Sequence, residues 1–269
     1  MSAKQHLAPL AAVLLAGLLL SACTSNGSSF APLSEGGGGG GGGITGSSSG
    51  GPPNDGTGPT NITQGGNPVT GNFVCTQGAG AYGDVTTQVG ANGLLGSSLS
   101  SLVNTLGGSD ATTLLNSVID PNNVIDGNLS TYAQYQLALS LFSAGGAIDS
   151  VDLSVLFPAG VTVPAGQFAV FGISFPAGTV NASILNDVTV STYLDVNGVY
   201  QPQESNTLTE SQLSLLGVTA LGQVPIWLGI ETTKPYDVAM LSLAPSVLSA
   251  QVGDAMNAYE LCTGGTLVQ

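Results

Sequence analysis

The stretch ILNDVTVSTYLDVNGVYQ, residues 184–201, carries a strong fold signal in this chain of 269 residues. Two runs rich in Val, Thr, Tyr and Leu flank the dipeptide Asn197-Gly198. A two-residue hairpin turn of type I′ needs positive φ angles at both positions, and Asn followed by Gly tolerates them best. The stretch therefore predicts a β-hairpin with one strand on each side of the turn.

Similar short apolar runs surround this hairpin and are separated by turn residues. We expect strands within residues 148–157, 167–175, 211–218, 225–232, 236–244 and 255–263. Strands at this spacing predict a mainly β fold, an antiparallel β-sandwich. A parallel α/β sheet is disfavoured because the region lacks the helices that parallel crossovers require.

The region before these strands has a different periodicity. Leucines recur at three-and-four spacing within residues 92–108, which predicts one amphipathic helix bounded by glycines. Residues 111–119 fit either a second short helix or a lead-in strand. The expected fold is thus a β-sandwich with one or two short N-terminal helices.

The composition limits the partners. The chain has 16 acidic and two basic side chains, and only 7% of its residues are charged, against about 25% in average soluble proteins. A hydrophobic fraction of 42% still suffices for a core. A net charge of −14 argues against nucleic acid and against a basic patch that binds anionic lipids.

The N-terminus predicts export. One Lys precedes an apolar run from Leu7 to Leu20, which is typical of a signal peptide and too short for a lasting membrane span. The sequence LSAC, which ends at Cys23, resembles the bacterial lipobox. This resemblance implies a lipoprotein whose residues 1–22 are removed and whose Cys23 carries lipid such as palmitate. Thr24, rather than Asp, after the Cys implies the outer membrane, with the domain periplasmic or at the cell surface. An ordinary signal peptide with a chance Cys is the alternative.

A low-complexity segment follows the lipidation site. Residues 24–72 are mainly Gly, Ser, Asn, Thr and Pro, with an unbroken run from Gly36 to Gly43. Such a chain behaves as a flexible linker with a root-mean-square reach of about 40 Å. We therefore expect the lipidated Cys and tether in residues 23–72 and a single folded domain in residues 73–269.

Removal of the signal peptide restricts the chemistry. The remaining chain has no His, no Arg and one Lys, Lys234. Ser-His-Asp and Cys-His mechanisms need an imidazole base, and most catalytic zinc sites need His ligands. The sequence thus indicates no enzyme but a cell-surface lipoprotein with a structural or adhesive role. A hydrolase that uses only carboxylates stays open, although Asp149 and Asp152 fit the solvated face of a strand better than a catalytic pair.

Two cysteines remain besides Cys23. Cys75 and Cys262 stand near the two ends of the predicted domain. In an exported protein such a pair indicates a disulfide, with a reduced pair as the alternative.

The stretch NNVIDGNLSTYAQY, residues 122–135, gathers oxygen atoms. The Asp126 carboxylate, turn carbonyl groups and the Thr131 hydroxyl are ligands that calcium prefers. An Asp-Gly-Asn sequence is also a common surface turn. From these residues alone both interpretations stay open.

A wider set of features carries a family resemblance. Together with AYELC at residues 258–262 and the two terminal cysteines, this stretch resembles the galactose-binding-like jelly rolls, which include discoidin (coagulation-factor type C) domains and carbohydrate-binding modules. The resemblance implies a jelly-roll sandwich with a structural Ca²⁺ ion, held by Asp126, the Asn128 carbonyl, Thr131 and Glu260. It also implies the alternative function, a carbohydrate-binding module. The partner that we expect is a glycan or a surface protein.

The chain departs from this family in its calcium-loop motif and in its sugar-binding loops. Tyr132 stands where family members usually have Trp, and the Arg and His of their sugar-binding loops are missing. The aromatic residues that could reach the surface are Tyr193 and Tyr200, whereas Trp227 fits the core better.

Overall fold

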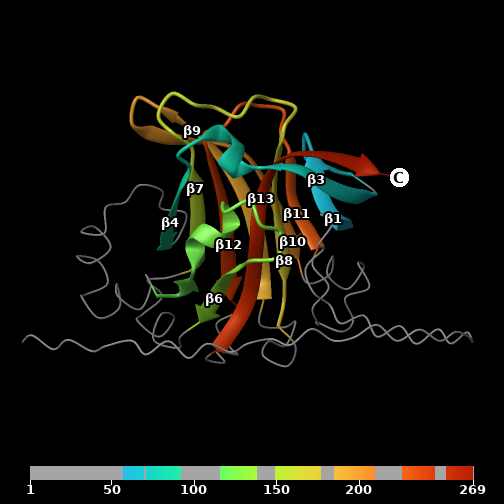
Figure 1. Ribbon diagram of the computed structural model, residues 1–269, viewed down its shortest axis with the longest axis vertical. Helices are drawn as coiled ribbons and strands as arrows, with labels where there is room; N and C mark the ends of the chain where they lie inside the picture. Colours follow the sequence, from blue (N-terminus) through green and yellow to red (C-terminus); the bar gives the residue numbers. More distant parts are fainter. Residues whose placement is uncertain are drawn as a thin grey trace, which may run out of the picture. The chain divides into compact units, whose positions relative to one another are not determined.

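The computed structural model describes residues 57–69, 71–91, 116–137, 149–176, 185–209, 226–245 and 253–268. These residues form thirteen strands and two short 3-10 helices, η1 (Ala79–Tyr82) and η2 (Pro121–Val124). The strands build two sheets that form a β-sandwich (Figure 1). The predicted mainly β sandwich is therefore confirmed.

The larger sheet contains eight strands. They are β1 (Thr57–Gln64), β2 (Asn67–Val69), β3 (Asn72–Gly78), β5 (Val118–Ile119), β6 (Ala133–Leu137), β8 (Phe168–Ser174), β11 (Ile226–Glu231) and β13 (Gly253–Val268). Their order is β2-β1-β11-β8-β13-β6-β5, and β3 pairs with both β1 and β13. In Figure 1 the long strand β13 runs beside β8 and β6, with β3 near its C-terminal end.

The smaller sheet contains five strands. They are β4 (Thr86–Ala91), β7 (Val151–Leu156), β9 (Leu185–Val196), β10 (Val199–Thr209) and β12 (Val238–Pro245). Their order is β10-β9-β12-β7-β4, and all neighbours are antiparallel. Strands β9 and β10 form the predicted hairpin, with Val196 opposite Val199.

The first two strands differ from the prediction. Strand β1 pairs in parallel with β11, Thr60 opposite Trp227, so the sandwich is not purely antiparallel. Strands β1 and β2 also lie within the residues predicted as tether, and the boundary at residue 73 is therefore too late. The mainly polar composition of this segment gave no indication of a strand. Its buried apolar residue, Ile62, is only 1% exposed and packs in a cluster with Trp227.

Strand β8 explains why the sandwich has two apolar layers. Every one of its residues is buried. Phe171 and Ile173 belong to the main core between the sheets, whereas Phe168 and Val170 belong to a second cluster on the other face, with Trp227. A continuous apolar run indicates a strand that is buried on both faces, and β8 is such a strand.

Strand β7 is also more buried than predicted. Asp149 is exposed, but Asp152 is only 1% exposed and accepts a hydrogen bond of 2.9 Å from the Ser150 hydroxyl. The prediction of a solvated face is thus wrong for Asp152. The alternating pattern misled because β7 is buried on both faces, with every residue from Val151 to Val155 buried.

The predicted disulfide is confirmed. Cys75 on β3 and Cys262 on β13 are bonded, with their Cα atoms 5.8 Å apart. This separation is typical of disulfides. The bond joins two strands that pair directly, so it locks the last strand to one of the first.

Several predicted segments lie outside the described residues. These are the signal peptide, most of the tether, the helix at residues 92–108 and the strand at residues 211–218. The end of residues 111–119 forms the short strand β5. Within the described ranges, the structure contains no helix with the length and apolar character needed to cross a membrane.

Candidate functional site

A surface pocket lies at one end of the sandwich, where three segments meet. Its volume is about 370 Å³. The segments are the connection after β7, the turn of the β9–β10 hairpin and the start of β12. The lining residues are Leu156, Phe157, Pro158, Ala159, Gly160, Thr162, Leu194, Asp195, Asn197, Gly198, Tyr200, Asp237 and Val238.

The hairpin turn places the polar side of the pocket. Asn197 and Gly198 have φ angles of 58° and 83°, as a type I′ turn requires. The Gly198 N–H donates a hydrogen bond of 2.6 Å to the Asp195 carboxylate. This bond joins the turn to the strand that precedes it. The turn places Tyr200, the second residue after it, directly opposite Asp195 in the hairpin.

Asp237 connects the hairpin to β12. Both oxygens of its carboxylate accept the Asp195 N–H, at 2.9 and 3.0 Å. Its own backbone is held from both sides, because its carbonyl accepts the Phe157 N–H and its N–H donates to the Tyr193 carbonyl. Burial raises the pKa of Asp237, and the nearby Asp195 charge raises it further, whereas the Asp195 N–H lowers it.

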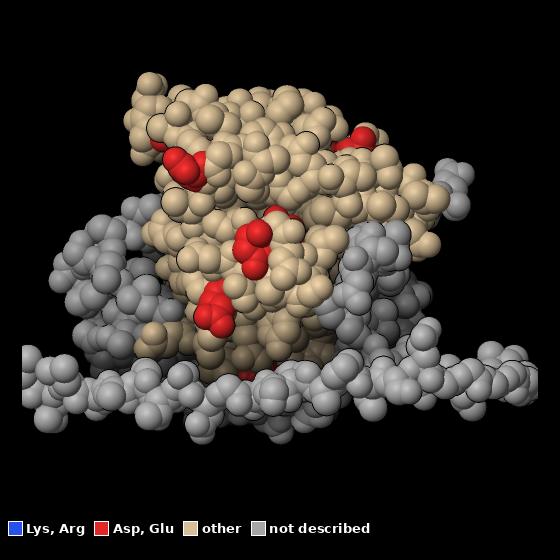
Figure 2. Space-filling model, viewed as in Figure 1, with Lys and Arg blue, Asp and Glu red and all other residues tan. Residues whose placement is uncertain are grey.

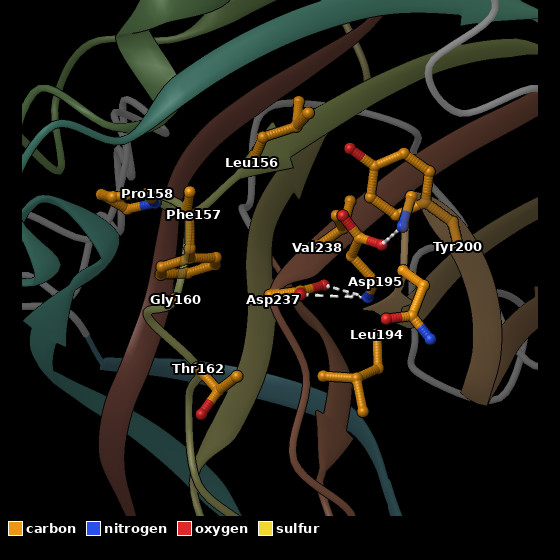
Figure 3. Close-up of a pocket in the computed structure, with 13 residues that line it drawn as sticks. Leu156, Phe157, Pro158, Gly160, Thr162, Leu194, Asp195, Tyr200, Asp237 and Val238 are labelled. Carbon is orange, nitrogen blue, oxygen red and sulfur yellow. Dashed lines mark hydrogen bonds between the residues drawn. The ribbon is translucent and has the colours of Figure 1, made fainter.

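The apolar side of the pocket is rigid. The Phe157 ring packs edge-on against Tyr82 and Tyr236, with centroid distances of 5.3 and 5.8 Å. Val238 is buried beneath the pocket, and Tyr200 is partly exposed. Figure 3 shows Phe157 on one side of the pocket, with Asp195, Asp237 and Tyr200 on the opposite side. The pocket thus places polar oxygens opposite an apolar wall.

The electrostatics of the pocket are negative. Two carboxylates and no cationic side chain line it. Burial raises the pKa of the Tyr200 hydroxyl, and the charges of Asp195 and Asp237 raise it further. Lys234, the only cation of the described residues, directs its Nζ to the Gln203 carbonyl at 3.3 Å. Isolated acidic side chains, and no Lys or Arg, appear on the face shown in Figure 2.

The residues of the predicted calcium site come together around the loop after η2. The Asp126 carboxylate accepts the Asn128 N–H at 2.8 Å. The Thr131 hydroxyl lies 2.8 Å from the other Asp126 oxygen and 2.8 Å from the Asn128 carbonyl. Glu260, on β13, accepts the Gly127 N–H at 3.0 Å. This hydrogen bond brings the loop next to Glu260, although 133 positions separate Gly127 from Glu260 in the sequence.

Glu260 is a buried carboxylate that is only partly hydrogen-bonded. The residue is 1% exposed, and its Oε1 is buried without a hydrogen-bond partner. Burial raises its pKa to about 7, the Gly127 N–H lowers it, and the Asp126 charge raises it. The carboxylate lines a cavity of about 150 Å³, and a Cβ on Gly78 would collide with its Oε1. Of the four predicted calcium ligands only Glu260 lines this cavity, and Asp126, Asn128 and Thr131 do not.

The same region does not contain a cluster of many strong ligands. No group of three or more His, Cys, Asp or Glu side chains that could hold a metal occurs among the described residues. Carbonyl and hydroxyl oxygens would have to complete the coordination, and calcium accepts such ligands whereas zinc prefers nitrogen and sulfur.

Sequence reasoning found part of the pocket. It identified the hairpin, to which it assigned Asp195, and named Tyr200 as a candidate surface aromatic, but it did not single out Asp237. The other two aromatic residues considered from the sequence lie in different environments. Tyr193 is partly buried, and Trp227 lies in the core, as predicted. Asp237 carried no sequence signal, because its partner Asp195 is 42 positions away.

Comparisons with known proteins add fold likenesses only. No family model and no curated protein matches the chain. It is similar to the C-terminal domain of a chitobiase from Bacteroides fragilis, with 13% identity, a TM-score of 0.34 and coverage of 70% of this chain and 97% of that one. It is also similar to the family 32 carbohydrate-binding module of C. perfringens NanJ, solved with galactose, with 11% identity, a TM-score of 0.31 and coverage of 66% and 94%.

A third similar structure is a carbohydrate-binding module specific for non-crystalline cellulose, CBM28. The identity is 10%, the TM-score is 0.34, and the match covers 52% of this chain and 79% of that one. All three TM-scores are below 0.5, so nothing about the ligand of this chain follows from these likenesses.

Proposed function

We propose that this chain is a non-catalytic carbohydrate-binding module, presented by a lipid-anchored protein of the outer membrane. The observation that supports it best is the pocket in which Tyr200 lies beside Asp195, Asp237 and Asn197. This combination favours the carbohydrate-binding alternative over a purely structural or adhesive role.

The pocket suits a sugar for physical reasons. A pyranose has one apolar face of C–H groups and a rim of hydroxyls that donate and accept hydrogen bonds. The Tyr200 ring offers an apolar surface, and the carboxylates of Asp195 and Asp237 accept hydrogen bonds strongly. A volume of about 370 Å³ lies at the lower end of the range for small-molecule pockets.

The arrangement suits binding rather than bond cleavage. The carboxylates of Asp195 and Asp237 are each engaged by a backbone N–H, which holds them in fixed positions. Fixed acceptors lose little conformational entropy when a ligand binds.

We also propose a structural calcium ion at the loop after η2. Asp126, the Asn128 carbonyl, Thr131 and Glu260 would hold it. The buried Glu260 Oε1, which has no hydrogen-bond partner, and the Gly127 N–H bond that joins the loop to Glu260 support this proposal. When bound, the ion would supply positive charge that joins the loop to β13.

The anchor belongs to the same proposal. The LSAC sequence that ends at Cys23 supports lipidation, and Thr24 supports the outer membrane. A long Gly-rich linker would let the module reach glycans away from the lipid surface.

Retention of the purified full-length protein on an array of neutral, amino and acidic glycans tests the function. We expect binding to at least one glycan class, and we expect Tyr200→Ala to abolish it. Tyr132→Ala is the matched control, because Tyr132 is 40% exposed but does not line the pocket. Failure to retain any glycan, or full retention by Tyr200→Ala, would contradict the proposal.

A further inference from the structure

The charge of the pocket restricts the kind of sugar that it can hold. Asp195 and Asp237 both line the cavity, and no Lys, Arg or His is among the lining residues. In the bound state, part of the water that screens these carboxylates would be displaced. An anionic sugar would then face two negative charges at short range, whereas a cation would be attracted.

Both carboxylates retain free acceptor capacity. The two Asp237 oxygens share a single N–H donor, that of Asp195. The Asp195 carboxylate accepts the Gly198 N–H through Oδ1. Because an ionised carboxylate offers about four lone-pair sites, each side chain can accept further hydrogen bonds from a ligand.

The aromatic ring adds a second element that favours a cation. Tyr200 shares the pocket wall with the two carboxylates, and it is the cross-strand partner of Asp195. The face of a tyrosine ring attracts an ammonium group, and the attraction grows when water is displaced. A carboxylate pair beside an aromatic ring is therefore suited to a primary amine.

We propose that the pocket binds an amino sugar that carries a free, protonated amino group. This inference rests on the proposed carbohydrate-binding function and specifies its ligand class. The ammonium group donates to Asp195 and Asp237, and the sugar ring lies against Tyr200. Uronic acids and sulfated sugars are excluded by repulsion, and N-acetylated sugars lose the charge and two of the donors.

Calorimetry with three soluble oligosaccharides of equal length tests the proposal. The probes are an oligomer of glucosamine, its fully N-acetylated counterpart and an oligomer of galacturonate, each at a pH where the free amine is protonated. We expect the glucosamine oligomer to bind about tenfold or more tightly than the N-acetylated one, as charge-assisted hydrogen bonds would give. Raising the salt from about 0.05 M to about 0.5 M should reduce this preference by screening.

Two variants assign the preference to the carboxylates. Asp237→Asn and Asp195→Asn each keep one oxygen that can accept the backbone N–H, so both should fold, as circular dichroism would verify. Each should lower the preference for the free amine about tenfold. Asp254→Asn is the control, because Asp254 is an acidic residue of β13 that does not line the pocket.

The outcomes separate this inference from the function on which it rests. If the N-acetylated or acidic oligomer binds as well as the amine in a Tyr200-dependent manner, the amino-sugar inference is wrong and the carbohydrate-binding function stands. The same holds if both Asn variants keep the preference. If no oligosaccharide of any class binds, both proposals fail.

Discussion

The backbone N–H of Gly127 donates a hydrogen bond of 3.0 Å to the carboxylate of Glu260, although 133 positions separate the two residues. The bond joins the loop after η2 to β13, the strand that also carries Cys262. The same strand thus holds both the predicted calcium loop and the disulfide.

Calcium should stabilise the folded protein by binding between the loop after η2 and Glu260 of β13. Binding only to the folded state adds about 2.7 kcal/mol at a hundredfold excess over Kd, so the melting temperature should rise when calcium replaces a chelator. Asp126→Ala should abolish the rise, whereas Asp84→Ala, an exposed acidic residue outside the loop, should keep it. A melting curve that chelator leaves unmoved would refute the calcium site.

Without calcium, stability should fall as the pH rises. The pKa of Glu260 is 4.5 in the unfolded reference and about 7 in the folded protein, so the folded state binds more protons between these values. The contribution of Glu260 to the free energy of unfolding is fully present below about pH 4.5, and it is lost as the pH rises through about 7. The difference is at most about 3 kcal/mol. Urea titrations in chelator should show this slope, and Glu260→Gln should flatten it. An equal slope in the variant would assign the effect to other groups.

Reduction of the disulfide should destabilise the fold strongly. Cys75 and Cys262 are separated by 187 positions, and closing so long a loop adds about 5 kcal/mol on the chain-entropy estimate. Denaturant titrations of the protein with and without reductant measure the difference. The double variant Cys75→Ser, Cys262→Ser should match the reduced protein and should not respond to reductant. A reductant-insensitive wild type would count against this role.

Asn206 should matter because it connects the two sheets. Its side-chain Nδ2 lies 2.9 Å from the Asn61 carbonyl, 3.0 Å from the Asn61 Oδ1 and 2.9 Å from the Gly229 carbonyl. Asn206→Ala should cost about 2 kcal/mol of unfolding free energy, because it removes a buried donor that joins β10 to β1 and β11. Asn206→Asp should cost more, since a carboxylate repels these oxygens. Ser205→Ala, at the exposed neighbour, should be almost neutral, and equal effects at both positions would remove the special role of Asn206.

The lipid anchor can be tested in cells. We expect metabolic palmitate labelling of the wild-type protein and its loss in Cys23→Ala, because the thiol of Cys23 is the predicted acceptor. Cys75→Ser is the matched control and should keep the label. Label that persists in Cys23→Ala would show that the lipobox interpretation is wrong.

The sequence was sufficient for features that depend on local chemistry. The Asn197-Gly198 pair predicts its turn because few other dipeptides tolerate two positive φ angles, and the structure contains that hairpin. The apolar run of β8 and the core position of Trp227 follow from hydrophobicity in the same way. The two cysteines could be paired because no other remains after Cys23.

Tertiary structure alone decided the features that depend on residues distant in sequence. The pairing of β1 with β11 uses backbone hydrogen bonds, which any sequence can make, so the polar composition of β1 hid it. Asp152 lies in a strand that is buried on both faces, and its alternating polar and apolar sequence does not record this burial. Asp237 reaches Asp195 only because β12 lies beside β9, and this pairing creates the acidic pocket. A one-dimensional pattern records the period of a strand, whereas the choice of its neighbours depends on how the whole chain packs.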